Sequence, residues 1–337
     1  MSRTVFARVF AILGLVAGPL FGTVAAADTL VVYSARNEQL IKPIFERYTA
    51  ETGVEVRFTT GEAGMLIERL AAEGRNSPAD ILLTVDAGEL WHAADRGLLS
   101  PVTSATLSRN IPANLRDPGN RWFGLSMRAR TLAYNPKTVD PLKLSTYVAL
   151  AEPAWKGRLC LRTSKKVYNQ SLVAMMIAQH GEAATEATVR GWVANLATEP
   201  FANDTQLLEA IAAGQCDVGI VNTYYFGRIV KERPDFPVRL FWADQKQGGV
   251  HVNISGAGVV ASSRKPAAAV RFLEWLSSVE TQNLFAALNM EYPANPAAAV
   301  DPIVRSWGTF QPSLINVSQA GQLQPAAVKL MDRAGYR

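Results

Sequence analysis

The chain has 337 residues, of which 48% are hydrophobic and 19% are charged, and its formal net charge is +5. The charge is dispersed: no basic run exceeds two residues, as at Lys165-Lys166, and no stripe of arginine and aromatic residues suggests a nucleic-acid-binding surface. A chain of this length is large for a single hydrophobic core and indicates two lobes.

The first 27 residues have the pattern of a secretory signal peptide. Arg3 and Arg8 precede an apolar run that ends in the small residues "VAAA", which predicts cleavage after Ala27. A membrane anchor is the alternative, but Gly18 and Pro19 interrupt the run, which is shorter than the ~20 residues that a spanning helix needs. Removal of the segment would lower the net charge to +3. The sequence therefore predicts export as a soluble protein.

After this leader, short apolar runs alternate with amphipathic runs. The predicted strands are 29–35, 54–58 and 79–85. The predicted helices are 65–74, 87–97 and an earlier one that ends near Gly53 and carries its apolar stripe on Ile41, Ile44, Phe45 and Tyr48. This βαβαβα order predicts a parallel sheet with helices on both faces.

The same alternation resumes later in the chain. The predicted strands are 157–163 and 216–222, and the predicted helices are 169–181, which Asn169 would cap, 205–214 and 267–278. Two extended segments, 124–136 and 251–262, lie between helix-rich regions. Either they cross between two lobes, which would make each lobe discontinuous in sequence, or they are ordinary strands within one lobe.

Two cysteines, Cys160 and Cys216, occur in a chain that we expect to be exported. A single disulfide is the expected arrangement in an oxidising compartment. A zinc site has little support, because there is no C-x-x-C motif and the three histidines are scattered.

Three tyrosines follow predicted strands, at the edge of the sheet where ligands bind in open parallel α/β folds. Tyr168 follows the strand 157–163, and the adjacent Tyr224 and Tyr225 follow the strand 216–222. Packing with hydroxyls bonded to the backbone is one interpretation. The other is a metal site, because phenolate oxygen is a hard anionic donor that suits ferric iron. The helix start and nearby lysines would favour a phenolate at Tyr168.

Several motifs make nearly all of the mature chain resemble the periplasmic ferric-ion-binding proteins of ABC-type iron importers. The most specific are "YNQS" (168–171) and "NTYY" (222–225); the others are "SPADILLTVD" (77–86), "RARTLAYNP" (128–136), "HVNISGAGVV" (251–260) and "EYPANP" (291–296). The resemblance implies that Tyr168, Tyr224 and Tyr225 bind iron.

The fold that this resemblance implies has two α/β lobes joined by crossing hinge strands, with the metal in a central cleft. We place the N-terminal lobe at 28–127 plus 257–305 and the C-terminal lobe at 128–256 plus 306–337.

The chain departs from one branch of the family in the turn after the first strand. That branch has a histidine-tyrosine pair where this chain has Asn37 and Glu38. Glu38 offers a carboxylate as a fourth ligand, and water, carbonate or another small anion would complete an octahedron. Arg128 and Arg130 either stabilise the ligands or an anion, or form a surface ion pair.

The resulting prediction is a monomeric periplasmic receptor, not an enzyme, that captures ferric iron and delivers it to an inner-membrane ABC permease. The rival with the same fold is a receptor for an organic solute such as a polyamine, thiamine or a phosphonate. An exported enzyme is a further rival; G-x-S-x-G is absent, and Tyr168 as a base has no partner in the sequence.

Overall fold

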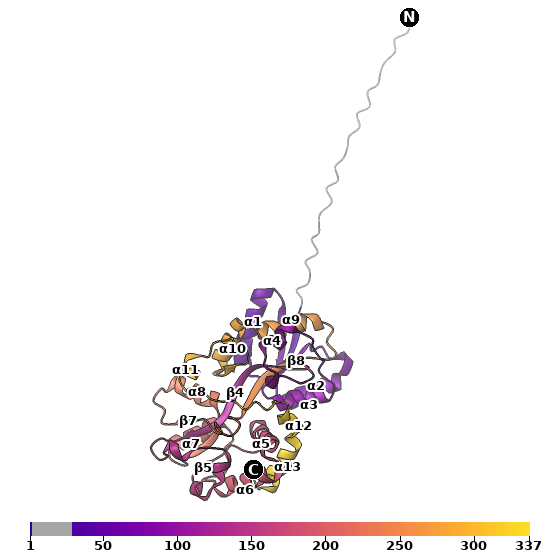
Figure 1. Ribbon diagram of the computed structural model, residues 1–337. Helices are drawn as coiled ribbons and strands as arrows, with labels where there is room; N and C mark the ends of the chain where they lie inside the picture. Colours follow the sequence, from indigo (N-terminus) through magenta and orange to yellow (C-terminus); the bar gives the residue numbers. More distant parts are fainter. Residues whose placement is uncertain (2–28) are drawn as a thin grey trace.

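A mixed sheet of nine strands runs through the molecule (Figure 1). The computed structural model describes Met1 and residues 29–337. The strand order is β2-β1-β3-β8-β4-β6-β5, with β7 and β9 also paired to β4. The strands are β1 (Thr29–Ser34), β2 (Glu55–Thr60), β3 (Ile81–Thr84), β4 (Phe123–Tyr134), β5 (Leu159–Cys160), β6 (Val218–Asn222), β7 (Arg239–Phe241), β8 (Val252–Val259) and β9 (Tyr292–Pro293).

Helices surround this sheet (Figure 1). They are α1 (Glu38–Thr52), α2 (Ala63–Glu73), α3 (Ala87–Asp95), α4 (Ala105–Asn110), α5 (Val167–His180), α6 (Glu182–Ala194), α7 (Asp204–Ala212), α8 (Thr223–Glu232), α9 (Pro266–Leu276), α10 (Val279–Asn289), α11 (Pro302–Arg305), α12 (Gln319–Gln322) and α13 (Gln324–Arg333).

The first helix shows how the sequence pattern determines the local structure. The predicted stripe of four apolar side chains on α1 is buried as expected. The helix ends at Gly53, whose φ of 74° lies in the left-handed region that glycine adopts without strain. The parallel pairing of β1 with both β2 and β3 confirms the predicted sheet in this part of the chain.

Strand β4 joins the two halves of the sheet. Its residues from Phe123 to Ala129 pair with β8, and those from Arg130 to Tyr134 pair with β6. We call β1, β2, β3, β8 and the elements packed on them the first half, and β5, β6, β7 and theirs the second half. The crossing predicted for 124–136 is therefore confirmed. The segment 251–262 enters β8, which lies between β3 and β4 in the first half. The lobe boundaries within the chain stay a prediction.

The predicted signal peptide lies outside the described residues, apart from Met1. In the part that the structure describes, no helix has the length and apolar character needed to cross a membrane.

Cys160 and Cys216 form the predicted disulfide, with a Cα–Cα distance of 5.9 Å. Cys160 ends β5, whereas Cys216 precedes β6 by two residues, so the bond links β5 to the segment that enters β6. Both side chains are buried in a cluster with Leu207 and Ile211 of α7.

Replacing both cysteines by serine should lower the free energy of unfolding by about 4 kcal/mol, because the bond closes a loop with a sequence separation of 56 residues. Urea unfolding of the oxidised parent and of the double variant measures this difference. Two free thiols in the denatured, unreduced parent would contradict the bond itself.

Candidate metal centre

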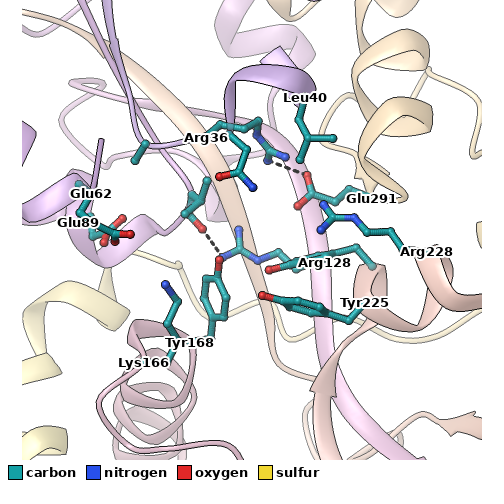
Figure 2. Close-up of a pocket in the computed structure, with 15 residues that line it drawn as sticks. Arg36, Leu40, Glu62, Glu89, Arg128, Lys166, Tyr168, Tyr225, Arg228 and Glu291 are labelled. Carbon is teal, nitrogen blue, oxygen red and sulfur yellow. Dashed lines mark hydrogen bonds and ion pairs between the residues drawn. The ribbon is translucent and has the colours of Figure 1, made fainter. Parts of the chain in front are cut away.

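A cavity of about 180 Å³ lies between the two halves of the sheet (Figure 2). It is lined by the turn after β1, by the starts of α2 and α3, by β4, and by the starts of α5 and α8. The lining residues are Ala35, Arg36, Asn37, Leu40, Glu62, Ala63, Val85, Glu89, Arg128, Lys166, Tyr168, Tyr224, Tyr225, Arg228 and Glu291.

The three predicted tyrosines meet in this cavity. Tyr168 lies in the first turn of α5, and Tyr224 and Tyr225 lie in the first turn of α8, directly after β6. The ring centroids of Tyr224 and Tyr225 are 4.5 Å apart. Tyr168 and Tyr224 are only 8% and 6% exposed to solvent. Because the chain turns from strand to helix at residue 222, neighbouring side chains no longer point to opposite faces, and both tyrosines reach the cavity.

Asn169 does not cap its helix, contrary to the prediction. The helix begins at Val167, two residues earlier, so Asn169 lies within its first turn. Its amide donates to the carbonyl oxygens of Arg162 and Thr163, and its side-chain oxygen accepts from Arg130 Nε at 2.9 Å. The residue therefore fixes the start of α5 from behind the cavity.

Arg130 is buried, which overturns the surface-pair interpretation, and it does not line the cavity. It donates to Asp204 Oδ2 at 2.9 Å and to Asn222 Oδ1 at 3.1 Å. Asn222 in turn donates to the Tyr224 hydroxyl at 3.3 Å. Arg130 thus holds Asn169 and Asn222, which belong to the two tyrosine motifs, from outside the cavity.

Arg128 is also buried, but it lines the cavity. One nitrogen donates to the Val85 carbonyl oxygen and lies 3.8 Å from Asp86 Oδ2, and the guanidinium lies 5.3 Å from the centre of the Tyr168 ring. Its Nε and Nη1 have no hydrogen-bond partner among the described residues. Buried N–H groups without acceptors are costly unless an anion or a phenolate comes to them.

Burial keeps Tyr168 and Tyr224 protonated. Desolvation raises the pKa of Tyr168 from 10.0 to about 12, although Arg128 and a hydrogen bond with Tyr224 act to lower it. Desolvation, followed by repulsion from the two other tyrosines, also raises the pKa of Tyr224 well above 10.0. The expectation that the helix start favours a phenolate at Tyr168 is therefore wrong for the protein without a metal, because burial outweighs the nearby positive charge.

Two further positive side chains contact the tyrosine pair and were not predicted. Arg162 donates to the Tyr225 hydroxyl at 3.2 Å, and Arg228 lies 4.9 Å from the centre of the Tyr224 ring. Arg162 lies two residues after the end of β5, directly before the "TSKK" turn, a position that the sequence pattern does not distinguish. Both would stabilise a negative charge on the phenolic oxygens.

The turn after β1 contributes less than predicted. Asn37 lines the cavity, whereas Glu38 is exposed at the first residue of α1 and does not line it. Arg36 is buried beside the cavity and donates to Glu291 Oε2 at 3.0 Å. Glu291 lies far away in the sequence, so only the fold brings this ion pair to the cavity wall.

Within residues 29–337, no group of three or more histidine, cysteine, aspartate or glutamate residues has the spacing of a metal site. A metal in this cavity would therefore depend on tyrosine oxygens. Three phenolates would balance three positive charges, and ferric iron is the biological cation that hard phenolate donors favour.

Comparisons with known proteins agree with this chemistry. Residues 33–283 match the model of the bacterial extracellular solute-binding protein family. Iron uptake protein A2 of Synechocystis is 42% identical over 321 residues, which cover 93% of this chain and 91% of that protein. A Trichodesmium FutA structure in complex with iron and citrate has a TM-score of 0.88 and 42% identity, and the match covers 92% of this chain and all of that one.

An open form of ferric iron-binding protein A from Mannheimia haemolytica is also similar. Its TM-score is 0.86 at 36% identity, and the match covers 92% of this chain and 99% of that one. One of these two structures holds iron and citrate and the other is a ferric iron-binding protein, and both share the fold described above.

The titration of Tyr168 tests the description of the cavity. Its pKa in the folded protein, about 12, lies above its ordinary value of 10.0, so this group's contribution to stability is complete below pH 10 and is lost as the pH rises through 12. The phenolate absorption of the metal-free parent minus that of Tyr168→Phe should show a midpoint near pH 12. A midpoint at or below pH 10 would contradict the burial of this hydroxyl.

Proposed function

The chain belongs to the family of bacterial extracellular solute-binding proteins, and we propose that it is a periplasmic receptor that captures ferric iron and delivers it to an inner-membrane ABC permease. The observation that carries the proposal is the convergence of Tyr168, Tyr224 and Tyr225 on one cavity of about 180 Å³. The iron-binding names of the relatives support it.

Iron capture exchanges protons for the metal. The phenols of Tyr168 and Tyr224 are protonated in the metal-free protein at neutral pH, so ferric iron must displace their protons as it binds. Arg162 and Arg228 would then stabilise the negative charge of the phenolates. Ferrous iron is softer and is held less tightly by phenolate, so reduction or reopening of the cleft would release the ion.

A small anion such as carbonate would complete the coordination. The Nε and Nη1 groups of Arg128 have no partner among the described residues, and Arg128 lines the cavity, so an anion bound to the metal would satisfy them. Citrate accompanies iron in the Trichodesmium neighbour, which supports an anion of this kind.

The rival organic-solute receptor is less well supported. Pockets for organic ligands usually measure ~300–1,000 Å³, and this cavity is smaller and lined mostly by charged and phenolic side chains. An ion with a small anion matches it better than a polyamine, thiamine or a phosphonate. A protein that stayed colourless in ferric iron would favour the rival.

The proposed receptor is a monomer and has no catalytic role. Tyr168 is unsuited to act as a catalytic base, since burial raises its pKa to about 12 and a base at neutral pH needs a much lower value. Turnover of a substrate by the metal-free protein would contradict this part of the proposal.

Replacing Tyr168, Tyr224 or Tyr225 by phenylalanine removes one anionic donor and keeps the ring. Each change should weaken ferric iron binding more than ~10-fold, because a charged interaction contributes at least ~1.5–3 kcal/mol. Competition with a chelator measures the affinity, and the visible phenolate-to-iron absorption band reports the ligands. A triple variant with an unchanged band would exclude these residues as ligands.

Glu38→Gln is the matched control. Glu38 is exposed outside the cavity, and its position at the start of α1 suits the helix dipole, so the variant should bind iron like the parent. Weaker binding together with a shifted band would make Glu38 the fourth ligand.

Iron should close the cleft. The two halves are joined by β4 and by the chain that enters β8, and receptors of this architecture close by rotation about such segments. Small-angle scattering should therefore give a smaller radius of gyration with iron than without it, at the mass of a monomer. Identical curves in both states would indicate a preformed site instead.

A further inference from the structure

Two acidic side chains and one basic side chain line the cavity from its two halves, and none of the three forms a side-chain hydrogen bond or ion pair within residues 29–337. Glu62 and Glu89 line it from the first half, at the starts of α2 and α3, and Lys166 lines it from the second half, at the start of α5. Elsewhere around the cavity, Arg36 and Glu291 already form an ion pair. The iron chemistry proposed above does not use these three side chains.

Glu89 is the most constrained of the three. Its Oε2 atom is shielded from solvent and has no hydrogen-bond partner in the described part of the chain. Desolvation, followed by repulsion from Asp86, raises the pKa of Glu89 to about 8, and Lys166 acts to lower it. A shielded carboxylate without a partner is unfavourable, so Glu89 mostly keeps its proton at neutral pH in this state, and an approaching cation would favour its ionised form.

Lys166 is placed to supply that cation. Its Nζ lies 5.1 Å from the centre of the Tyr168 ring, and Figure 2 shows the ammonium group on the side that faces Glu62 and Glu89. The adjacent Lys165 is exposed and does not line the cavity. The pair of lysines therefore contains one member that faces the cavity and one that does not.

A hydrogen bond already joins α5 to the start of α3. The Ser171 hydroxyl of α5 donates to Asp86, the residue that caps α3, at 2.9 Å. Glu89 lies three residues after Asp86 on α3, and Lys166 lies five residues before Ser171 at the start of α5. A small rotation about the Asp86–Ser171 contact would change the distance between Glu89 and Lys166.

From these contacts we propose that Lys166 pairs with Glu89 when the cleft closes, and that this ion pair between the two halves slows the departure of iron. Glu62 adds negative charge beside the pair. The inference rests on the proposed function and adds residues that control release without binding the metal. Because the pair would exist only in the closed state, it would stabilise that state and act mainly on the dissociation rate.

The test is a double-mutant cycle on iron release to a competing chelator at low ionic strength, where charge interactions are least screened. Glu89→Gln and Lys166→Gln should each speed release about fivefold, and the double variant should be no faster than either single variant. Glu89→Lys combined with Lys166→Glu should restore slow release. Lys165→Gln is the matched control and should release iron at the parent rate.

The visible band distinguishes the pair from direct coordination. It should be unchanged in all of these variants, because neither residue binds the metal. A band that shifts in Glu89→Gln alone would make Glu89 an iron ligand and overturn the proposal. Additive rates in the cycle, or equal rates for Lys165→Gln and Lys166→Gln, would also overturn it. A parent without any band would instead count against iron binding itself.

Discussion

The buried ion pair between Arg130 and Asp204 holds the tyrosine site together. Arg130 lies where β4 begins to pair with β6, and its guanidinium reaches α5 through Asn169, α7 through Asp204 and the end of β6 through Asn222. Asp204 also accepts from the backbone N–H of Asn222 at 2.9 Å. Removing Asp204 would leave Arg130 buried without its carboxylate, which is strongly unfavourable, and removing Arg130 would leave Asp204 with only the longer ion pair to Arg162 Nη1 at 3.6 Å.

Different residues of each tyrosine motif hold the site in place and line the cavity. The asparagines of the two tyrosine motifs accept hydrogen bonds from Arg130, and the tyrosines of the same motifs line the cavity. The two helix starts are therefore fixed relative to each other before any ligand arrives. A metal that enters this cavity meets donors that need little reorganisation, which favours tight binding.

The electrostatics of the cavity favour a highly charged cation. Burial keeps Tyr168 and Tyr224 neutral in the metal-free protein, while Arg128 and Lys166 line the same space. A weakly charged cation would meet neutral phenols at Tyr168 and Tyr224. Only an ion that polarises phenols enough to remove their protons turns the three oxygens into anions, and the surrounding positive charges then stabilise the complex.

The sequence by itself determined the order of β1 to β3 and α1 to α3, the tyrosine motifs and the disulfide, because each depends on local periodicity or on residue types with few alternatives. Several later elements, among them α6, α10 and β7, were not predicted. Only the tertiary structure decided which charged side chains line the cavity and how burial shifts the pKa of Tyr168. The local pattern of "RARTLAY" does not distinguish Arg128 from Arg130, yet Arg128 lies where β4 pairs with β8 and lines the cavity, whereas Arg130 lies where β4 pairs with β6 and does not. Glu89 and Glu291 come to the cavity from distant elements, and the pKa of Tyr168 depends on burial that no local pattern records. Contacts between residues far apart in the chain, and the desolvation that they produce, exist only once the two halves of the sheet are packed together.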